Sequence, residues 1–339
     1  MNIFRPCLTL AFAGIAATPT ACAATATQVL PTVYEAGHFY ATPETVDGQK
    51  LKLLVDTGGG GRSGMYWISK AAAQRLHLKS ITCTVEGQKQ PVARLPDYKV
   101  GHGLPPPGKG PCGAALLVFP QGDNSFDGQL GGGYLPGRVW TFDYPAHRLT
   151  FDGNGWQPDP TAHQTPLGFP HDAEGGKTSG FARITIRVDG RPLDMLLDTG
   201  ATSYPTPDAV RISGTPTVHG EGVTSYITTS MLEHWHKAHP DWRVVEDADN
   251  KVATKPLERI IEVPKVEIAG WMVGPVWFTE QPDHAYHVWM ANMMDKSVEG
   301  AVGGNVFRHF VMTIDYPHEA AYFRCVTGCK AAVTPPPGP

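Results

Sequence analysis

The sequence repeats one pattern at two places, and this repeat limits the possible folds more than any other feature. In both places a Val-Asp-Gly triplet precedes an apolar run that ends in Asp-Thr-Gly. The spacing from Asp47 to Asp56 is nine residues, and the spacing from Asp189 to Asp198 is also nine. Matched patterns at a long interval indicate one structural unit that is used twice.

A second pair of matched segments follows the two Asp-Thr-Gly triplets. An apolar, glycine-rich segment begins at Gly128 and at Gly300, and an Asp-Tyr-Pro triplet follows each after 15 residues, at Asp143 and at Asp315. The second copy is roughly 30 residues longer between its two anchors, and insertions into a repeat map to loops. The chain is therefore predicted to hold two versions of one unit.

Most of each copy is predicted to form short strands. Residues 181–188 alternate apolar with polar side chains, Asp189-Gly190 is a hairpin signal, and an apolar strand then leads to Asp198. The Asp47-Gly48 turn precedes Asp56 in the same way. We expect an all-β, mainly antiparallel fold of two β lobes related by a pseudo-two-fold axis, with a few short helices.

Two helices are predicted. A short one covers residues 68–76, after the first Asp-Thr-Gly. A clearer one lies in the extra length of the second copy, with Ser230 as N-cap, Glu233 completing a capping box, and Pro240 beyond its end.

The predicted organisation has five parts, since residues 152–180 are rich in Gly, Pro, Asp and His and lack apolar periodicity. They are a signal peptide (1–23), an N-terminal lobe (24–155), a linker (156–179), a C-terminal lobe (180–328) and a Pro-rich tail (329–339).

The first residues are typical of an export signal. Arg5 precedes an apolar run over residues 8–17, and Ala21-Cys22-Ala23 has the small-x-small form of a cleavage site. Cys22 leaves lipidation as an alternative, although Pro19 stands where a lipid-anchor signal prefers a branched aliphatic residue. The run is too short to span a bilayer. We expect an exported, periplasmic or secreted protein with no membrane segment in its mature form.

Four cysteines follow this leader: Cys83, Cys112, Cys325 and Cys329. An even number in an oxidising compartment favours disulfides, and local order pairs Cys83 with Cys112 and Cys325 with Cys329. A four-cysteine metal site is the alternative, but zinc frameworks usually contain two close Cys-x-x-Cys pairs.

The repeat gives the two aspartates a chemical meaning. If equivalent turns meet on a pseudo-two-fold axis, Asp56 and Asp198 face each other. Adjacent carboxyls share a proton, so one acts as acid and the other as base. A water held between them can then attack a peptide carbonyl with no metal and no covalent intermediate. The alternative is that Asp, Thr and Gly are ordinary turn residues that were duplicated with the lobe.

A strand, Asp-Thr-Gly and a later apolar-apolar-Gly element resemble the pepsin and retropepsin aspartic peptidases, including bacterial retropepsin-like proteins. Leu130-Gly131 and Val302-Gly303 match the later element. The resemblance covers nearly the whole mature chain, and residues 198–203 are similar to the retropepsin pattern. It implies a bilobal acid-protease-like fold with a cleft between the lobes, built here from one chain.

The resemblance also implies roles for the residues around each aspartate. Asp56 and Asp198 would be the catalytic pair, and Thr57 and Thr199 would brace the turns across the lobe interface. Gly58 and Gly200 would permit a tight turn and a close approach of substrate.

The first copy departs from the family after its Asp-Thr-Gly. Gly59, Gly60 and Gly61 follow it, whereas the second copy has Thr202 and Ser203 as candidate substrate contacts. A loose glycine run would weaken the fixed geometry that acid-base catalysis requires. Residues 95–111 are a flap candidate by position, or a plain surface loop.

Other functions find less support in the sequence. His234, His236 and His239 offer at most a two-ligand face on the predicted helix, and a metal-dependent hydrolase is the lower alternative. A non-catalytic peptide-binding or inhibitory protein on the same fold is the other. The net charge of −4, from 28 basic and 32 acidic residues, does not indicate a nucleic-acid-binding protein. We expect an aspartic endopeptidase, a monomer without cofactor, acting on polypeptide.

Overall fold

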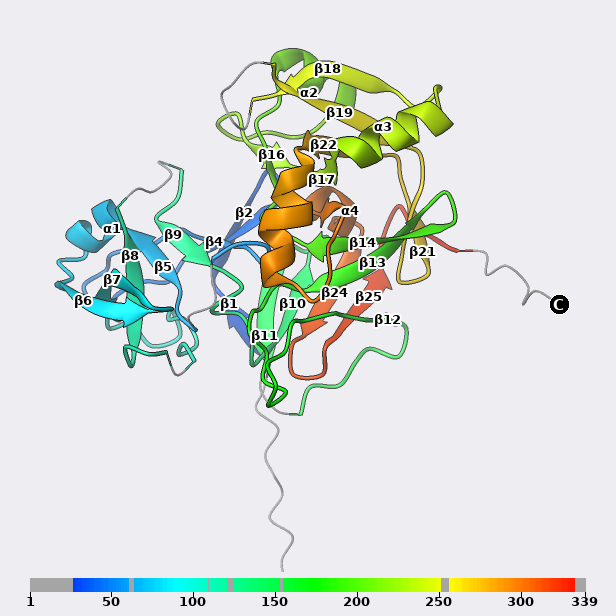
Figure 1. Ribbon diagram of the computed structural model, residues 1–339. Helices are drawn as coiled ribbons and strands as arrows, with labels where there is room; N and C mark the ends of the chain where they lie inside the picture. Colours follow the sequence, from blue (N-terminus) through cyan, green and yellow to red (C-terminus); the bar gives the residue numbers. More distant parts are fainter. Residues whose placement is uncertain are drawn as a thin grey trace, which may run out of the picture.

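The computed structural model describes residues 27–60, 64–108, 110–120, 125–152, 155–250 and 256–332. It consists mainly of β-strands in three large sheets, two in separate lobes and one shared between them (Figure 1). The predicted leader and most of the Pro-rich tail lie outside the described residues. No helix within the described ranges is long and apolar enough to cross a membrane.

The first lobe is an eight-stranded sheet of order β2-β3-β4-β9-β5-β8-β7-β6, on the left in Figure 1. A short helix, α1 (Lys70–Arg75), follows β5, and Ser69 caps it by accepting a hydrogen bond from the Ala72 amide at 3.1 Å. The strands are β2 (Thr32–Glu35), β3 (His38–Ala41), β4 (Leu53–Val55), β5 (Trp67–Ser69), β6 (Ser80–Val85), β7 (Gln88–Arg94), β8 (Ala115–Phe119) and β9 (Gly128–Leu130).

The second lobe is a ten-stranded sheet of order β18-β19-β22-β17-β23-β14-β13-β20-β21-β26. Its strands are β13 (Arg183–Val188), β14 (Arg191–Leu197), β17 (Ser225–Thr228), β18 (Val244–Asp249), β19 (Glu258–Val263), β20 (Val266–Ile268), β21 (Trp271–Val273), β22 (Val276–Gln281), β23 (Gly300–Val302) and β26 (Lys330–Ala331). Strands β15 (Thr202–Ser203) and β16 (Gly222–Val223) pair separately. The helices are α2 (Pro207–Ser213), α3 (Thr229–Ala238), a π-helical turn η1 (Ala285–Trp289), a 3₁₀ turn η2 (Met290–Met293) and α4 (Gly304–Phe307).

The shared sheet places the pseudo-two-fold axis. Its order is β1-β11-β10-β24-β25-β12, so the Asp-Tyr-Pro hairpins of the two copies lie side by side. At its centre Thr141 pairs with Thr313, its equivalent in the other copy, and their hydroxyl oxygens are 2.9 Å apart. A residue that pairs with its own equivalent lies on the axis. The strands are β1 (Gln28–Leu30), β10 (Val139–Asp143), β11 (Arg148–Asp152), β12 (His163–Pro166), β24 (Phe310–Asp315) and β25 (Ala320–Cys325).

The predicted fold class is confirmed: the protein is mainly antiparallel β, with two β lobes and few short helices. A single large hydrophobic cluster runs through both lobes and the shared sheet, and Trp140, Phe142 and Ile314 at the sheet centre are fully buried. The predicted linker is less irregular than expected, because it contains β12, which forms the edge of the shared sheet beside β25. This strand forms because its backbone pairs with β25, and its polar sequence does not predict a strand.

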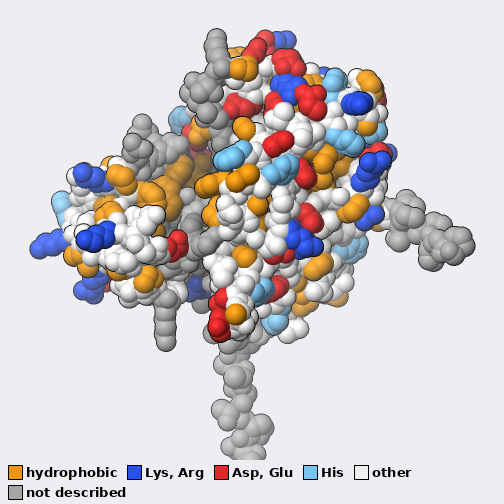
Figure 2. All heavy atoms as spheres, in the orientation of Figure 1, with side chains coloured by type: hydrophobic (Ala, Val, Ile, Leu, Met, Phe, Trp, Pro, Cys, Tyr) orange, Lys and Arg blue, Asp and Glu red, His pale blue; other side chains and the backbone are white. Residues whose placement is uncertain are grey.

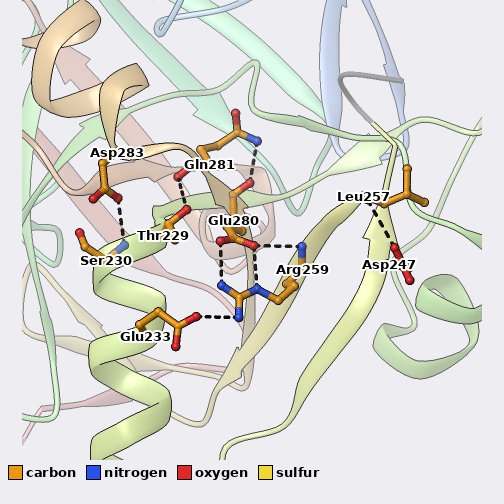
Figure 3. Close-up of polar contacts among 9 residues, drawn as sticks. All are labelled: Thr229, Ser230, Glu233, Asp247, Leu257, Arg259, Glu280, Gln281 and Asp283. Atoms are coloured by element: carbon orange, nitrogen blue, oxygen red, sulfur yellow. Dashed lines mark hydrogen bonds and ion pairs between the residues drawn. The ribbon is translucent and has the colours of Figure 1, made fainter. Parts of the chain in front are cut away.

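The long helix of the second lobe begins differently from the prediction. Its N-cap residue is Thr228, two residues before Ser230, and the Ser230 amide donates to Asp283 Oδ1 at 2.9 Å. Glu233 forms no capping box, because its carboxylate pairs with Arg259 at 2.7 Å (Figure 3). Arg259 at the start of β19 and Asp283 just after β22 therefore bind the two groups, the Glu233 carboxylate and the Ser230 amide, that the sequence pattern had placed in a local capping box.

The structure contains the two expected disulfides. Cys83 is bonded to Cys112 and joins β6 to the loop before β8, whereas Cys325 is bonded to Cys329 beyond the end of β25. Disulfides are typical of proteins in an oxidising compartment.

Candidate active site

Two parallel strand pairs deliver the Asp-Thr-Gly turns to the lobe interface. Strand β4 pairs with β9 in the first lobe, and β14 pairs with β23 in the second. The amide of Asp56 donates to the Leu130 carbonyl at 3.0 Å, and that of Asp198 donates to the Val302 carbonyl at 2.9 Å. The spacings that match in the sequence thus produce the same backbone connection in each lobe.

Each turn holds its own aspartate in the same way. The Gly58 amide donates to Asp56 Oδ1 at 2.8 Å, and the Gly200 amide donates to Asp198 Oδ1 at 2.9 Å. A hydrogen bond to a carboxylate both orients it and favours its ionised form.

The two threonines form a reciprocal set of four hydrogen bonds across the lobes. The Thr57 hydroxyl donates to the Leu197 carbonyl at 2.6 Å and accepts from the Thr199 amide at 3.0 Å. The Thr199 hydroxyl donates to the Val55 carbonyl at 2.8 Å and accepts from the Thr57 amide at 3.1 Å. Both side chains are buried, at 0% and 1% exposed. The two turns are therefore locked to each other on the axis.

Each glycine of a turn lies against the aspartate of the other lobe. A Cβ atom at Gly58 would lie 2.3 Å from the Asp198 Cγ, and one at Gly200 would lie 2.2 Å from the Asp56 Cγ. Real Cβ atoms do not approach other atoms so closely, so both positions require glycine. Since Gly58 also binds Asp56 through its amide, the two carboxyl groups lie side by side on this glycine.

Three buried phenols lie within electrostatic range of the two carboxyls. Burial, with a smaller contribution from Asp198 and Asp56, raises the pKa of Tyr286 on η1 well above its ordinary value. Burial and then Tyr34 and Asp198 raise the pKa of Tyr144, and burial and then Asp56 raise that of Tyr316. Tyr144 and Tyr316 belong to the two Asp-Tyr-Pro triplets, so both anchors of the repeat converge here. Neither of their hydroxyls has a hydrogen-bond partner among the described residues.

The structure adds one polar residue that sequence reasoning missed. The side-chain amide of Gln129 on β9 donates to Asp56 Oδ2, and its carbonyl oxygen accepts from the Trp67 indole at 2.9 Å. Gln129 directly precedes the Leu130-Gly131 element, and its equivalent in the second copy is Ala301. The signal available in the sequence was that a polar glutamine in one copy stands where the other copy has alanine.

The glycine run after Asp56 is held by backbone contacts in its described part. The Gly132 amide donates to the Gly59 carbonyl at 2.6 Å. Gly60 has φ of +85°, and a Cβ there would lie 2.8 Å from the Gly131 Cα. Gly58 to Gly60 are therefore a packed turn rather than a loose segment, while Gly61 lies outside the described residues.

The predicted substrate contacts of the second turn are partly engaged elsewhere. Ser203 is buried, and its hydroxyl donates to Asp249 Oδ2 at 2.5 Å. Thr202 is half-buried; its hydroxyl donates to the Gly200 carbonyl at 2.8 Å and lies 3.1 Å from His38 Nε2. Ser203 thus supports the wall of the turn, and Thr202 is the better placed of the two for contact with a ligand.

His38 is a buried titratable group that links the lobes at this turn. It is 1% exposed, and burial lowers its pKa to about 4. The imidazole is therefore neutral at neutral pH, when its charged form would lack solvation.

The remaining candidates lie apart from the aspartates. His239, the C-cap residue of α3, stacks on Trp242 and pairs with Asp189 at 3.2 Å. Among the described residues no group of three or more His, Cys, Asp or Glu side chains is arranged to hold a metal. Residues 95–108, in the flap candidate, are tied to the first lobe: the Tyr98 hydroxyl lies 2.7 Å from that of Tyr66, and Tyr134 donates to the Pro105 carbonyl at 2.5 Å.

The molecular surface is recessed near the lobe interface. Figure 2 shows hydrophobic side chains on both sides of the recess between the first lobe, on the left, and the rest of the molecule. Basic and acidic side chains are interspersed over the remainder of this face.

No protein-family model and no curated protein matches the sequence. Solved structures match over most of the chain. Soybean basic 7S globulin is 11% identical with a TM-score of 0.44, covering 88% of this chain and 94% of that one. Conglutin gamma from lupine seeds is 12% identical with a TM-score of 0.44, covering 88% of this chain and 94% of that one. An aspartic proteinase from Irpex lacteus is 11% identical with a TM-score of 0.46, covering 89% of this chain and 98% of that one.

Proposed function

We propose that the protein is an aspartic-type endopeptidase in which Asp56 and Asp198 activate a water molecule for attack on a peptide bond. The observation that carries the proposal is the reciprocal packing of the turns, in which Gly58 and Gly200 each touch the aspartate of the opposite lobe. Two carboxyls forced together on an axis cannot both ionise at low cost, so they share one proton.

The shared proton supplies both halves of the chemistry. The ionised carboxylate takes a proton from the water, and the water oxygen forms a bond to the peptide carbonyl carbon. The protonated carboxyl donates to the carbonyl oxygen, which takes up the electron pair of the C=O bond. Collapse of this tetrahedral species breaks the C–N bond, and the proton taken from water passes to the leaving amine. As the C=O bond re-forms, a hydroxyl of the tetrahedral species returns its proton to the other carboxylate, so the pair again holds one proton and no cofactor is required.

Fixed geometry supports this role. Catalysis by preformed groups needs carboxyls that do not reorganise during the reaction. The four threonine bonds and the two glycine amides fix both aspartates through backbone atoms of both lobes. Since both turns belong to one chain, a monomer would contain a complete site.

The finer assignment rests on the sequence pattern. Residues 198–203 resemble the retropepsin-like branch of the aspartic peptidases, and we include that branch in the proposal. An exported protein with polypeptide as substrate is consistent with the leader-like first residues and with the disulfides.

The test is peptide cleavage from acid to neutral pH by the wild type, Asp56→Asn and Asp198→Asn, each with and without a chelator. We expect both substitutions to abolish cleavage, because half of the pair cannot be both acid and base, and we expect the chelator to have no effect. Asp208→Asn, at a carboxyl whose side chain is 77% exposed on α2, is the matched control and should keep full activity. Cleavage that survives Asp56→Asn or Asp198→Asn would refute the mechanism.

A non-catalytic peptide-binding protein is the second candidate, and Tyr286 favours it. Its ring is buried among Phe181, Leu196 and Ala201, beside the Asp198 turn. Besides burial, both carboxylates contribute to the raised pKa of its phenol. The orange helical segment in Figure 1, η1 and η2, carries this residue. A side chain so placed would compete with a substrate. A wild type that binds peptides in a calorimeter but cleaves none at any pH would support this candidate.

A further inference from the structure

The orientation of the Gln129 amide is dictated by Trp67. An indole N–H can only donate, so the oxygen 2.9 Å from it must be the Gln129 carbonyl oxygen. The NH₂ end is thereby turned toward Asp56 Oδ2. Gln129 is 8% exposed, so a flipped amide would leave its NH₂ group facing a second donor, the indole N–H of the half-buried Trp67, which is costly.

Asp56 therefore has a fixed donor from outside its own turn. This donor serves Oδ2, while the Gly58 amide serves Oδ1. Gly59 leaves the space for it, because a Cβ there would lie 2.5 Å from Gln129 Nε2 and 2.6 Å from Asp56 Oδ2. In the second lobe Ala301 occupies the position that matches Gln129, beside Leu196 on β14, and its methyl group cannot donate.

We infer that Gln129, oriented by Trp67, is a positioning residue that holds Asp56 as the ionised member of the pair, so that Asp56 takes the proton from water and Asp198 carries the shared proton. The inference rests on the proposed function. A donor to a carboxylate stabilises its charged form. The groups that act on Asp56 include Asp198, which lies against Gly58, and the phenols of Tyr286 and Tyr316. Both phenols are neutral, whereas Asp198 competes with Asp56 for the negative charge of the pair.

The principal test compares Gln129→Met with the wild type and with Gln281→Met. Gln281, on β22, is equally buried at 8% exposed and lies outside the site. For Gln129→Met we expect kcat to fall about 10- to 100-fold with KM little changed, as for loss of a hydrogen bond to a charged group. The acid limb of the kcat profile should move up by about one pH unit. Gln281→Met should change neither.

Trp67→Phe gives a graded version of the same test. It removes the N–H and keeps a ring, so the Gln129 amide is free to turn either end toward Asp56. We expect a smaller shift of the acid limb in the same direction. A fall in kcat with no movement of the acid limb in either variant would reduce Gln129 to a packing residue and overturn the inference.

A measurement without catalysis separates this inference from the proposed function. In Asp198→Asn, Asp56 titrates without its coupled partner, and its carboxyl carbon can be followed by ¹³C NMR as the resonance that is lost in Asp56→Asn. Adding Gln129→Met should raise the midpoint of that titration by about one pH unit. An unchanged midpoint would refute the role of Gln129, whether or not the wild type cleaves peptides.

Discussion

The turns at Asp56 and Asp198 have the same backbone and different surroundings. In both, the glycine amide holds the aspartate, and the threonine hydroxyl binds two backbone groups, both of them in the other lobe. Beyond these contacts the lobes diverge. The first Asp-Thr-Gly triplet is followed by Gly59, and its aspartate accepts a hydrogen bond from Gln129 on β9. The second triplet is followed by Ala201 and then by Thr202, whose hydroxyl contacts His38.

The difference shows which parts of a duplicated site remain alike. Bonds that cross the axis need both copies, so a change in one copy breaks a contact made by the other. Groups that touch only one aspartate have no such constraint, and Gln129 and Ala301 illustrate this freedom. The symmetry of the protein therefore lies in the threonines and glycines, and its asymmetry lies in the strand that follows each turn.

The largest expected effect tests the symmetric part. Thr57→Val and Thr199→Val each remove a hydroxyl and leave a buried amide and a buried carbonyl unpaired. We expect each to lower the free energy of unfolding by about 4 kcal/mol, measured by denaturant titration, with loss of peptide cleavage. Thr57→Ser and Thr199→Ser keep the hydroxyl and should remain within about 1 kcal/mol of wild type. Markedly unequal effects of the two valine variants would show that the lock is not symmetric.

The symmetric part was also the part accessible from sequence. Matched spacings predicted that Asp56 and Asp198 end equivalent strands, and the threonine and glycine positions followed from the triplets themselves. Gln129 could not be found in this way, because its role depends on a parallel strand pairing that brings β9 beside β4 across 75 residues of loop and sheet. Strand β12 and the Asp283 contact at α3 were missed for the same reason. They are made by tertiary neighbours and leave no local pattern.

The second prediction tests a contact present on one side only. His38 touches Thr202, and the matching residue of the other copy is Gly180. Burial lowers the pKa of His38 to about 4, whereas the unfolded chain protonates near the ordinary value. The unfolded state therefore binds more protons between these values, and stability is lost as pH falls through this window. The full loss amounts to about 3 kcal/mol.

The measurement is the unfolding free energy of wild type and His38→Gln over the pH range from neutral to about 4. The variant carries no titrating group at this position, so its curve should lack the loss that His38 causes. Parallel curves would mean that His38 is not protonated on unfolding in this range, and the proposed burial effect would be wrong.

The third prediction makes the first turn resemble the second. Gly59→Ala introduces the residue that stands at position 201, and its Cβ would displace both Gln129 Nε2 and the Asp56 carboxylate, which would lie 2.5 Å and 2.6 Å from it. Because the clash meets the ends of two side chains and no backbone atom, the loss of stability should be modest, about 1 to 2 kcal/mol. Cleavage should fall at least as far as in Gln129→Met, and the double variant Gly59→Ala/Gln129→Met should be no worse than Gly59→Ala alone, because Gly59→Ala already removes the Gln129 contact. Additive losses in cleavage would show that Gly59 acts independently of Gln129.

The smallest expected effect concerns the extra length of the second lobe, where Arg259 joins Glu280 and Glu233 (Figure 3). Glu280 is 14% exposed and binds Arg259 through two oxygens at 2.8 Å, whereas Glu233 is 56% exposed. Glu233→Gln should therefore cost under about 1 kcal/mol and less at high salt. Glu280→Gln should cost about 2 kcal/mol, because it leaves the partly buried guanidinium with its more exposed partner alone. Neither should alter peptide cleavage. If Glu233→Gln did reduce cleavage, the inserted helix α3 would be coupled to the carboxyl pair through β22 and η1, and the asymmetry of the lobes would extend from the strand beside Asp56 to the whole insertion of the second lobe.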